Sequence, residues 1–486
     1  MARRSPDVHL TLRLPDSDAP LRHRISEAII DAIRLGVLGP GDALPSTRIL
    51  ATELGVARAG VVEAYDELGA AGYTVARPGS GTTIAAGADA AAAARAATHA
   101  PVRPTHPPTA TPPLPSPLWD LTPGRPDPDL ISPGDWRRAW RAAAAAPIQP
   151  HPPGPDGHLE LRRALTVHLR RTRGIAAHPD ELVITPGVNA ALRTLAAAAE
   201  LGGRDVAFEE PGYGNARRSL EMAGARTRPV AVDDDGLDPA TLRTTDAAVY
   251  CTPAHQYPLG ARMPVTRRAG LVARATESGM LIIEDDYDGE FRYDVSALPA
   301  LRSIEGGREH VAYVGTASKI ISPSIRLAWL LPPPALLGRV YESLRLSGEN
   351  SCAVTGLALA EFIESGALTR HLTRASRTYS ARRSALVGAL RRQSPLLDLP
   401  GLELAGIEAG LHVVLRLPDG VDDDAIAADL GRRGLALLGL APYRTVAGGP
   451  RGLMLGYARL PETRADAVAA TIADVVGRHL GSDPVT

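Results

Sequence analysis

Lys319 is the only lysine in a sequence of 486 residues, in which the other 52 of the 53 basic residues are arginines. An arginine side chain stays charged at every accessible pH, whereas a lysine amine can lose its proton and bond covalently to a carbonyl carbon. Chance retention of one surface lysine would explain the count equally well. The chemical role of Lys319 therefore depends on the residues around it.

Lys319, Asp285 and Tyr287 each follow a predicted strand at the point where that strand ends. The apolar run 311–315 precedes Lys319, and the run 280–283 leads into Asp285 and Tyr287. Because the carboxyl ends of parallel strands meet at one edge of a sheet, we expect these side chains in one crevice. A buried carboxylate is costly unless paired, but opposite a protonated pyridine nitrogen it is stable, while the phenol can bond a ring oxygen. A solvated loop is the other interpretation of this acidic run, although the preceding apolar residues argue against it.

A third predicted strand leads through Gly187, Val188 and Asn189 into a helical stretch. Free N–H groups at a helix start bind a dianion, and a glycine lets the backbone come close to it. Ser318 and Arg326 would complete this phosphate cup from the other side. An amine, a carboxylate, a phenol and a phosphate cup together match the polar groups of pyridoxal 5′-phosphate, although each feature alone is weak evidence.

The composition is typical of a globular chain, with 44% hydrophobic and 22% charged residues. The net charge of −1 excludes attraction of the whole chain to nucleic acid or membranes, so any such binding must be local. Cys251 and Cys352 are too few for a disulfide framework, and the first residues show no secretory signal. No apolar run of about eighteen residues occurs. We therefore expect a cytoplasmic protein without membrane contact, and the sequence predicts no metal site.

Composition divides the chain into a first part at 10–86, an Ala- and Pro-rich linker at 87–118 and a large part at 119–480. Eight of the 17 residues from 101 to 117 are proline. A Pro-rich segment extends by about 3.1 Å per residue, so this stretch can span on the order of 50 Å. The two flanking parts therefore need not touch within one chain.

The first part is predicted to contain three helices and a hairpin. Apolar residues at helical spacing cover 21–35, Ser46 suits the N-cap of a helix over 47–54, and a third helix covers 58–71. Alternating residues from 73 to 85 around a Gly-rich tip predict a two-stranded wing. The pattern indicates a winged helix-turn-helix, and a small helical dimerisation module is equally consistent with the spacing.

The stretches LGVLGPGDALPSTRILATELGV, VVEAYDELGAAGY and RPGSGT resemble, in that order, the winged helix-turn-helix of GntR-type transcription regulators. The resemblance implies binding of double-stranded DNA, with the helix from Arg58 in the major groove. It also implies contacts to phosphates or base edges from Ser46, Arg48, Arg77 and the wing-tip residue Gly79.

Two features of this part predict weak DNA binding by a single copy. Residues 1–86 hold nine arginines and ten acidic residues, and the start of the third helix carries Ala57, Ala59 and Gly60 where the family usually has polar residues. Each neutralised phosphate contributes to the salt-dependent affinity. We therefore expect binding to depend on a dimer and paired half-sites.

Beyond residue 118, apolar runs alternate with long helical patterns, which predicts an α/β domain with a mostly parallel sheet. The motifs GTASKIISPSIRLAWLL, LIIEDDYDGEFRY, EEPGYGNAR and CTPAHQYPLG resemble the aminotransferase-like, fold type I pyridoxal-phosphate enzymes. The resemblance implies a smaller C-terminal α+β subdomain and an internal aldimine between the cofactor and Lys319. It also places Tyr213 against the ring, and His255 and Tyr257 near its 3-oxygen. Ordinary packing in loops is the other interpretation of these three residues.

A GntR-like winged helix joined by a Pro-rich linker to this fold is the architecture of the MocR/GabR family of bacterial regulators, which the chain resembles over nearly its full length. The resemblance implies a head-to-tail homodimer. It also implies an effector, which is either a small amine that displaces Lys319 or pyridoxal phosphate itself. We therefore expect a regulator of vitamin B6 or amino-acid metabolism genes rather than a catalyst. The alternatives are an aminotransferase-like enzyme with a vestigial DNA-binding module and a vitamin B6 buffer.

Three positions depart from the pattern of amino-acid-binding relatives. Met454 stands where many relatives carry an arginine that clamps a substrate carboxylate, and Asn189 replaces a frequent glutamine. The segment 151–157 lacks the tyrosine that aminotransferases commonly contribute across the dimer. The arginines that could replace the missing clamp are Arg217, Arg451 and Arg459.

Overall fold

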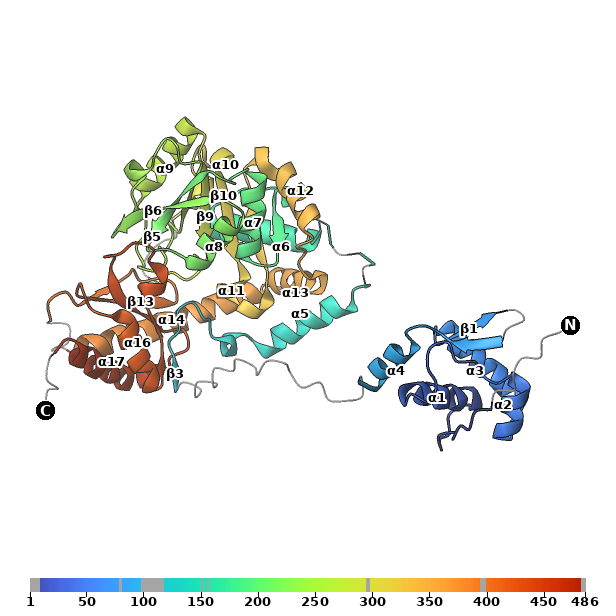
Figure 1. Cartoon of the computed structure of the whole chain (residues 1–486). Coiled ribbons are helices and arrows are strands. Elements are labelled where there is room, and N and C mark those ends of the chain that lie inside the picture. Colours follow the sequence, from blue (N-terminus) through green and yellow to red (C-terminus); the bar gives the residue numbers. More distant parts are fainter. Residues whose placement is uncertain are drawn as a thin grey trace. The chain divides into compact units, whose positions relative to one another are not determined.

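The structure, a computed structural model, describes residues 9–77, 81–97, 118–148, 150–151, 153–154, 157–293, 298–393 and 399–481. These residues fall into two compact units, within Met1–Pro113 and Leu114–Thr486. The first unit is drawn in blue and the second in cyan to red in Figure 1. Each unit buries a hydrophobic core of its own.

The described part of the N-terminal unit is a winged helix-turn-helix followed by one more helix. Its elements are α1 (Leu21–Arg34), α2 (Thr47–Leu54), α3 (Arg58–Ala70), β1 (Thr74–Arg77), β2 (Gly81–Ile84) and α4 (Ala88–Ala97). The strands β1 and β2 pair antiparallel, with Thr74 opposite Ile84. Ser46 accepts a hydrogen bond from the backbone N–H of Ile49, as expected of the N-cap of α2. The predicted fold of this part is thus confirmed.

Apolar residues on one face of each helix form the core of the N-terminal unit. Ile25, Ile29 and Ile33 recur every four residues along α1 and are buried, and Leu50 from α2 and Leu68 from α3 pack in the same cluster. This spacing is the one that places side chains on a single helix face. The helix-turn-helix is therefore held by the apolar pattern that predicted it.

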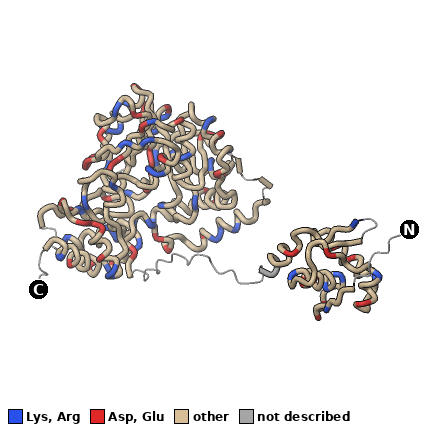
Figure 2. The backbone as a smooth tube through the Cα atoms, in the orientation of Figure 1, with Lys and Arg blue, Asp and Glu red and all other residues tan. Residues whose placement is uncertain are grey.

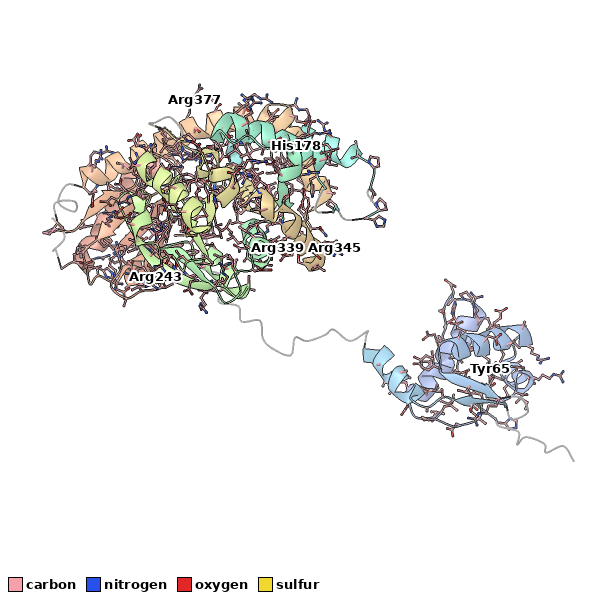
Figure 3. The ribbon with its side chains drawn as sticks, turned by 90° about the horizontal axis from the view of Figure 1, so that it is seen from above. Tyr65, His178, Arg243, Arg339, Arg345 and Arg377 are labelled. Atoms are coloured by element: carbon pink, nitrogen blue, oxygen red, sulfur yellow. The ribbon has the colours of Figure 1, made fainter. Side chains whose placement is uncertain are left out.

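Two contacts fix α3 in this core. Tyr65, labelled inside the N-terminal unit in Figure 3, donates its hydroxyl proton to the carbonyl oxygen of Pro45 at 2.9 Å. Gly60 lies so close to α1 that a Cβ atom there would be 2.8 Å from Cδ2 of Leu21. The glycine near the start of α3, unusual for a recognition helix, is therefore explained by helix packing.

Residues 88–97, which their composition assigned to the linker, form helix α4 instead. Ala88 and Ala92 are buried in the core of the N-terminal unit, and α4 packs against α1. Alanine is the best helix former, and its small side chain permits close approach. The predicted linker boundary at residue 87 is corrected accordingly, and the stretch from 98 to 117 lies outside the described residues.

Replacing Ala92 with Glu should destabilise the N-terminal unit by about 2 kcal/mol or more, because a charge would be buried where α4 meets the core. Amides of α1 should then exchange about thirtyfold faster, as measured by native-state hydrogen exchange with mass spectrometry. Ala93→Glu, on the exposed face of the same helix, is the matched control. Equal exchange in the two variants would contradict the packing of α4.

The second unit is built on one large sheet. Its strands are β4 (Val183–Thr185), β5 (Asp205–Glu210), β6 (Arg226–Asp233), β7 (Gly236–Leu237), β8 (Ala248–Cys251), β9 (Leu281–Asp286), β10 (Val311–Thr316) and β11 (Ala328–Leu331). Within the described residues the sheet has eight strands in the order β4, β11, β10, β9, β8, β5, β6, β7. The five strands from β10 to β6 in this order run parallel, and the others pair antiparallel. The predicted mostly parallel α/β sheet is confirmed.

Helices cover both faces of this sheet, which Figure 1 shows in green to orange. The principal helices are α5 (Pro133–Ala145), α6 (Leu159–Arg173), α7 (Val188–Ala198), α8 (Gly214–Met222), α9 (Val265–Ser278), α12 (Leu337–Ser347), α13 (Ala353–Glu364) and α14 (Ala367–Arg392). Ile283 and Val314 pack with α7, α8 and α12. Their neighbours Ile282 and Tyr313 belong to clusters that include α9 and α14. Since strand residues alternate between faces, polar side chains from these strands can converge only at the strand ends.

The C-terminal part forms the predicted smaller α+β subdomain. Among the described residues, its antiparallel sheet runs in the order β12 (Glu403–Ala405), β13 (His412–Leu417), β16 (Arg451–Gly456) and β15 (Leu438–Gly439). The helices α16 (Asp423–Arg432) and α17 (Ala465–His479) pack on this subdomain. At the start of the unit, β3 (Trp119–Asp120) pairs in parallel with β14 (Leu435–Ala436). None of the helices in the described ranges is long and apolar enough to cross a membrane.

Candidate functional site

A cavity of about 180 Å³ lies at the carboxyl ends of the parallel strands. Its position is the one expected for a ligand site in an open α/β sheet. The predicted residues that line it are Gly187, Val188, Asn189, Tyr213, Tyr257, Asp285, Tyr287, Ser318, Lys319 and Arg326. The structure thus places together ten of the residues proposed from the sequence to hold one small molecule.

Lys319 lies on α11 (Ala317–Ile320), directly after β10, and its amine reaches back to the start of the unit. Nζ donates a hydrogen bond to the carbonyl oxygen of Gly124 at 2.9 Å. Gly124 has φ +69°, a backbone conformation that favours glycine, and a Cβ atom there would lie 2.8 Å from Nζ and displace the amine from this position. Burial lowers the pKa of Lys319 below its usual value, while the nearby carboxylates of Asp288 and Asp285 act in the opposite direction. The amine is therefore more easily neutral than a surface lysine.

Asp285 presents one unpartnered oxygen at the cavity. Oδ2 accepts the hydroxyl proton of Tyr250 at 2.6 Å, whereas Oδ1 is buried and has no hydrogen-bond partner among the described residues. Burial raises the pKa of Asp285 to about 7, and the Tyr250 hydrogen bond opposes this shift. A buried acceptor without a donor is costly, so Oδ1 is a place where a ligand N–H would be stabilising.

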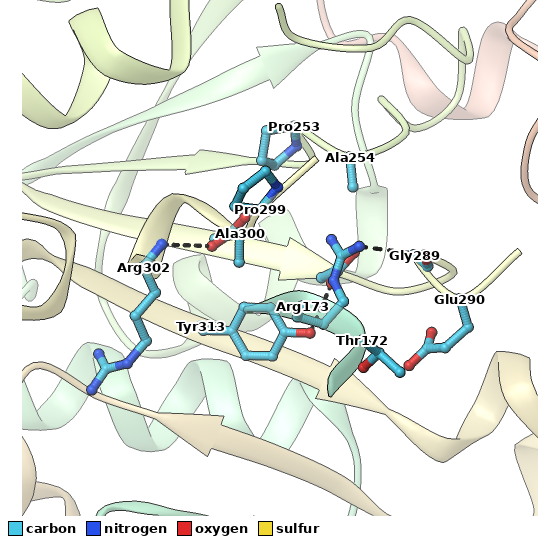
Figure 4. A network of polar contacts seen from close by, with 12 residues as sticks. Thr172, Arg173, Pro253, Ala254, Gly289, Glu290, Pro299, Ala300, Arg302 and Tyr313 are labelled. Atoms are coloured by element: carbon cyan, nitrogen blue, oxygen red, sulfur yellow. Dashed lines mark hydrogen bonds and ion pairs between the residues drawn. The ribbon is translucent and has the colours of Figure 1, made fainter. Parts of the chain in front are cut away.

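Asp286, the next residue of β9, faces the other side of the sheet and has a different role. Its Oδ2 accepts the Tyr313 hydroxyl proton at 2.7 Å and lies 2.5 Å from Nε of the buried Arg173. Figure 4 shows Arg173 and Tyr313 in this network, with Gly289 accepting a bond from Arg173. Asp286 is therefore paired inside the protein, which leaves Asp285 as the carboxylate of this strand that faces the cavity.

The residues predicted to form a phosphate cup, at the start of α7 and at Arg326, lie next to each other on the cavity lining. Gly187 has φ +126°, a backbone conformation that favours glycine, and a Cβ atom there would lie 3.2 Å from Nη2 of Arg326. The first N–H groups of α7, from Val188, have no partner within the helix. None of the ion pairs among the described residues engages Arg326. The helix start and the guanidinium therefore present hydrogen-bond donors of the kind that suit an anion.

Aromatic residues form one wall of the cavity. Tyr213 meets Tyr257 edge to face with ring centres 5.6 Å apart, and Tyr257 donates its hydroxyl proton to Tyr443 at 3.0 Å. His255 was expected near the ring's 3-oxygen, and it lies behind Tyr287, with Nδ1 3.0 Å from the Tyr287 hydroxyl. His255 therefore does not line the cavity and can act on it only through Tyr287.

Several cavity residues escaped the sequence reasoning. These are Tyr250, Thr252, Thr316 and Pro323 on the lining, and Gly124 beneath the amine. Tyr250 lies on β8, and Thr252 follows this strand directly, so the strand-end rule that found Asp285 could have found Thr252. Gly124 carries no such signal, because it contacts Lys319 across 195 residues of sequence.

The residues considered for a carboxylate clamp lie outside the lining of this cavity. Met454 is fully buried in an apolar cluster with Leu259, Val414 and Leu440. Each candidate arginine is already near a carboxylate of its own. The pairs are Arg217 with Glu210 at 2.7 Å, Arg451 with Asp423 at 3.7 Å and Arg459 with Asp120 at 3.1 Å.

In the N-terminal unit, the residues proposed to contact DNA are exposed where the structure describes them. Ser46, Arg48, Arg58 and Arg77 all lie at the surface, and Gly79 lies outside the described residues. Figure 2 shows basic and acidic residues interspersed over this unit. The charge pattern is therefore mixed, which suits a few specific contacts better than a broad basic patch.

The two units match two different families. Residues 21–84 match the family described as bacterial regulatory proteins, gntR family, and residues 128–469 match aminotransferase class I and II. An archaeal alanine:glyoxylate aminotransferase superimposes with a TM-score of 0.68 at 25% identity, covering 74% of this chain and 90% of that chain.

Two relatives share both units. The chain is 36% identical over 469 residues to the HTH-type pyridoxine biosynthesis transcriptional regulator PdxR of Corynebacterium glutamicum, covering 95% of this chain and 97% of the relative. It is 30% identical over 468 residues to the probable rhizopine catabolism regulatory protein MocR of Rhizobium meliloti, covering 93% of each. The whole architecture, and not only one domain, is therefore shared.

The amine of Lys319 should lose its proton at a lower pH than the ordinary lysine value of 10.5, because burial disfavours its charged form. The pH dependence of acetylation at Lys319, followed by peptide mass spectrometry, measures this pKa. Asp285→Asn should lower it further, since a carboxylate that stabilises the ammonium is removed. A midpoint at or above the ordinary value would contradict the described environment.

Proposed function

Because the chain belongs to the MocR family of transcription regulators, we propose that pyridoxal 5′-phosphate held on Lys319 changes the affinity of its N-terminal unit for a double-stranded DNA operator. One observation carries the cofactor proposal. The Lys319 amine, the unpartnered oxygen of Asp285 and the guanidinium of Arg326 line the same cavity.

The residues of the cavity fit the polar groups of pyridoxal phosphate one by one. Oδ1 of Asp285 is an acceptor without a donor among the described residues, as a ring N–H requires. Arg326 and the start of α7 suit a phosphate dianion. When bound, the cofactor supplies an aldehyde for an amine and a ring that withdraws electrons.

The electrostatics of Lys319 and Asp285 support the same proposal. Burial raises the pKa of Asp285 to about 7 and lowers the pKa of Lys319, so both charges are costly without partners. A cationic ring N–H opposite Asp285 would offset the cost of the carboxylate. The cavity therefore favours a ligand with one donor near Asp285 and one group that reacts with an amine.

An aminotransferase-like enzyme is the alternative function, and the arginines argue against it. Arg217, Arg451 and Arg459 are near carboxylates of their own, and Met454 is buried among apolar side chains. Of the lining residues, Arg326 alone carries a guanidinium, and in this proposal that guanidinium binds the phosphate. It is therefore not free to bind a substrate carboxylate. Sustained transamination with common amino donors would support the enzyme function. Its absence would support the regulator function.

We propose the cofactor itself as the signal, in preference to a small amine. The missing clamp weakens the case for an amino-acid effector, and the relative from Corynebacterium glutamicum is named as a regulator of pyridoxine biosynthesis. A ligand shifts the equilibrium between two states of a regulator only by the difference in its binding free energy to them, typically about 1–3 kcal/mol. Operator binding would place the protein with the chromosome in the bacterial cytoplasm.

Pyridoxal phosphate should change the operator affinity of the wild-type chain by roughly 5- to 150-fold, the usual range of such coupling. Fluorescence anisotropy with a labelled fragment from upstream of the protein's own gene measures the dissociation constant with and without cofactor. Lys319→Ala should remove the response. Pyridoxine 5′-phosphate, which lacks the aldehyde, is the matched chemical control and should have little effect. Specific binding that is identical with and without pyridoxal phosphate would overturn the cofactor as signal.

We also propose that the functional form is a head-to-tail homodimer, and an apolar groove beside α5 and α13 supports it. The groove has a volume of about 560 Å³. Ile148 on its rim is 97% exposed, and Val354 is 41% exposed. Large exposed apolar side chains along one groove are typical of an interaction surface. The near-neutral charge of the N-terminal unit also supports a dimer, because weak DNA binding by one copy is strengthened by a second copy on a paired half-site.

Ile148→Asp should weaken dimerisation at least about thirtyfold, since a large apolar side chain buried in an interface can contribute about 2 kcal/mol. Sedimentation equilibrium of the full chain measures the dissociation constant. Met222→Asp alters another exposed apolar residue, at 78% exposure on α8, and should leave the association unchanged. A monomeric wild type, or an unaffected Ile148 variant, would contradict this interface.

A further inference from the structure

Three buried side chains form a chain of contacts behind the cavity wall. Nδ1 of His255 lies 2.9 Å from Oδ2 of Asp288 and 3.0 Å from the hydroxyl oxygen of Tyr287. His255 and Asp288 are 1% and 2% exposed, so water does not compete for these contacts. Tyr287 is the member that lines the cavity. The order from inside to cavity is therefore Asp288, His255, Tyr287.

The position of the hydrogen on the His255 ring decides which of these three side chains donates and which accepts. If Nδ1 lacked a hydrogen, its lone pair would face the oxygen of Asp288 at 2.9 Å, which is repulsive. With a hydrogen, Nδ1 donates to Asp288 and has no lone pair left for the Tyr287 hydroxyl. The Tyr287 oxygen can then at most accept a share of this one N–H, and the Tyr287 hydroxyl cannot donate its own proton to Nδ1. Because Tyr287 lines the cavity, a ligand bound there can accept that proton.

The other ring nitrogen of His255 supports this tautomer. Nε2 is buried and has no hydrogen-bond partner within the described ranges. An N–H there would be a buried donor without an acceptor, which costs more than a nitrogen lone pair in the same place. Both nitrogens therefore favour the hydrogen on Nδ1.

Two glycines hold the imidazole ring in this orientation. A Cβ atom on Gly410 would lie 2.3 Å from Cε1 of His255, and one on Gly260 would lie 3.3 Å from Nε2. Gly410 and Gly260 have φ +71° and +80°, so both are also favoured as glycine by their backbone. The ring is thus packed between two backbone segments and cannot rotate freely.

Other ionisable groups around His255 do not replace these contacts. His412 has its ring centre 5.2 Å away, and its Nε2 donates to the carbonyl oxygen of Pro258 at 3.0 Å. Burial lowers the pKa of His412 to about 4, so it stays neutral. Arg292 reaches the carbonyl oxygen of Ala254 at 3.4 Å. Burial raises the pKa of Tyr287, so the phenol keeps its proton.

We propose that Asp288 and His255 orient the hydroxyl proton of Tyr287 so that this phenol donates a hydrogen bond to the 3-oxygen of pyridoxal phosphate. This rests on the proposed cofactor. His255 and Asp288 are positioning residues, because they reach the cavity only through Tyr287. Their role sets how firmly the 3-oxygen is held, and hence the affinity for the cofactor.

The test compares cofactor affinity in single and double variants. His255→Leu and Tyr287→Phe should each weaken pyridoxal phosphate binding about tenfold or more, the loss expected for a hydrogen bond to a charged oxygen. The double variant should be no weaker than Tyr287→Phe alone, because His255 acts through Tyr287. His255→Asn, whose amide can donate from the place of Nδ1, should restore most of the affinity. Titration of the full chain by absorbance measures all four constants.

A second measurement needs no cofactor. Nitrogen NMR of histidine-labelled protein, with His255 identified by its loss in His255→Asn, should show the hydrogen on Nδ1. His412→Asn is the control for loss of a buried imidazole, and it should lower stability without the Tyr287-dependent loss of affinity. A hydrogen on Nε2 alone, or additive effects of the His255 and Tyr287 changes, would overturn the proposal. Failure of the wild type to bind pyridoxal phosphate would instead overturn the proposed function.

Discussion

The cost of burying a carboxylate and an amine at one sheet edge is the constraint on which this molecule depends. Asp285 is buried with one oxygen unpartnered among the described residues, and Lys319 is held a short distance along the same edge by a backbone carbonyl. Burial destabilises the charged form of both groups, since it raises the pKa of the acid and lowers that of the amine. Buried groups with pKa values shifted in this way are typical of functional sites.

The rest of the large unit keeps these two groups in place. Strand pairing sets Asp285 beside Val314, so the exits of β9 and β10 lie next to each other. Alternation along β9 turns Asp286 to the other face, where Arg173 and Tyr313 neutralise and bond it. The apolar layers on both faces exclude water from the strands and leave the carboxyl edge as the polar surface. Small residues at Gly124 and Gly187 then admit the amine and the guanidinium.

Local sequence patterns predicted much of the fold and most of the cavity. The cap at Ser46 and the apolar spacing of α1 are properties of a few neighbouring residues, and the structure agrees with both. Asp285 and Lys319 were found because strand ends in a parallel sheet converge. Contacts between distant segments had no such signal, as with Gly124 under Lys319 and Tyr250 against Asp285. Helix α4 was missed because packing against α1, and not composition, decides whether an alanine run is ordered.

Reduction of the wild-type chain with borohydride in the presence of pyridoxal phosphate, followed by peptide mass spectrometry, tests the central claim most directly. Capture of the cofactor by the amine at this sheet edge predicts one phosphopyridoxyl group on the peptide that contains Lys319. The label should be lost in Asp285→Ala and Arg326→Ala at cofactor concentrations that saturate the wild type. An unlabelled Lys319, or labelling that is unchanged in Asp285→Ala and Arg326→Ala, would contradict a cofactor site formed by these residues.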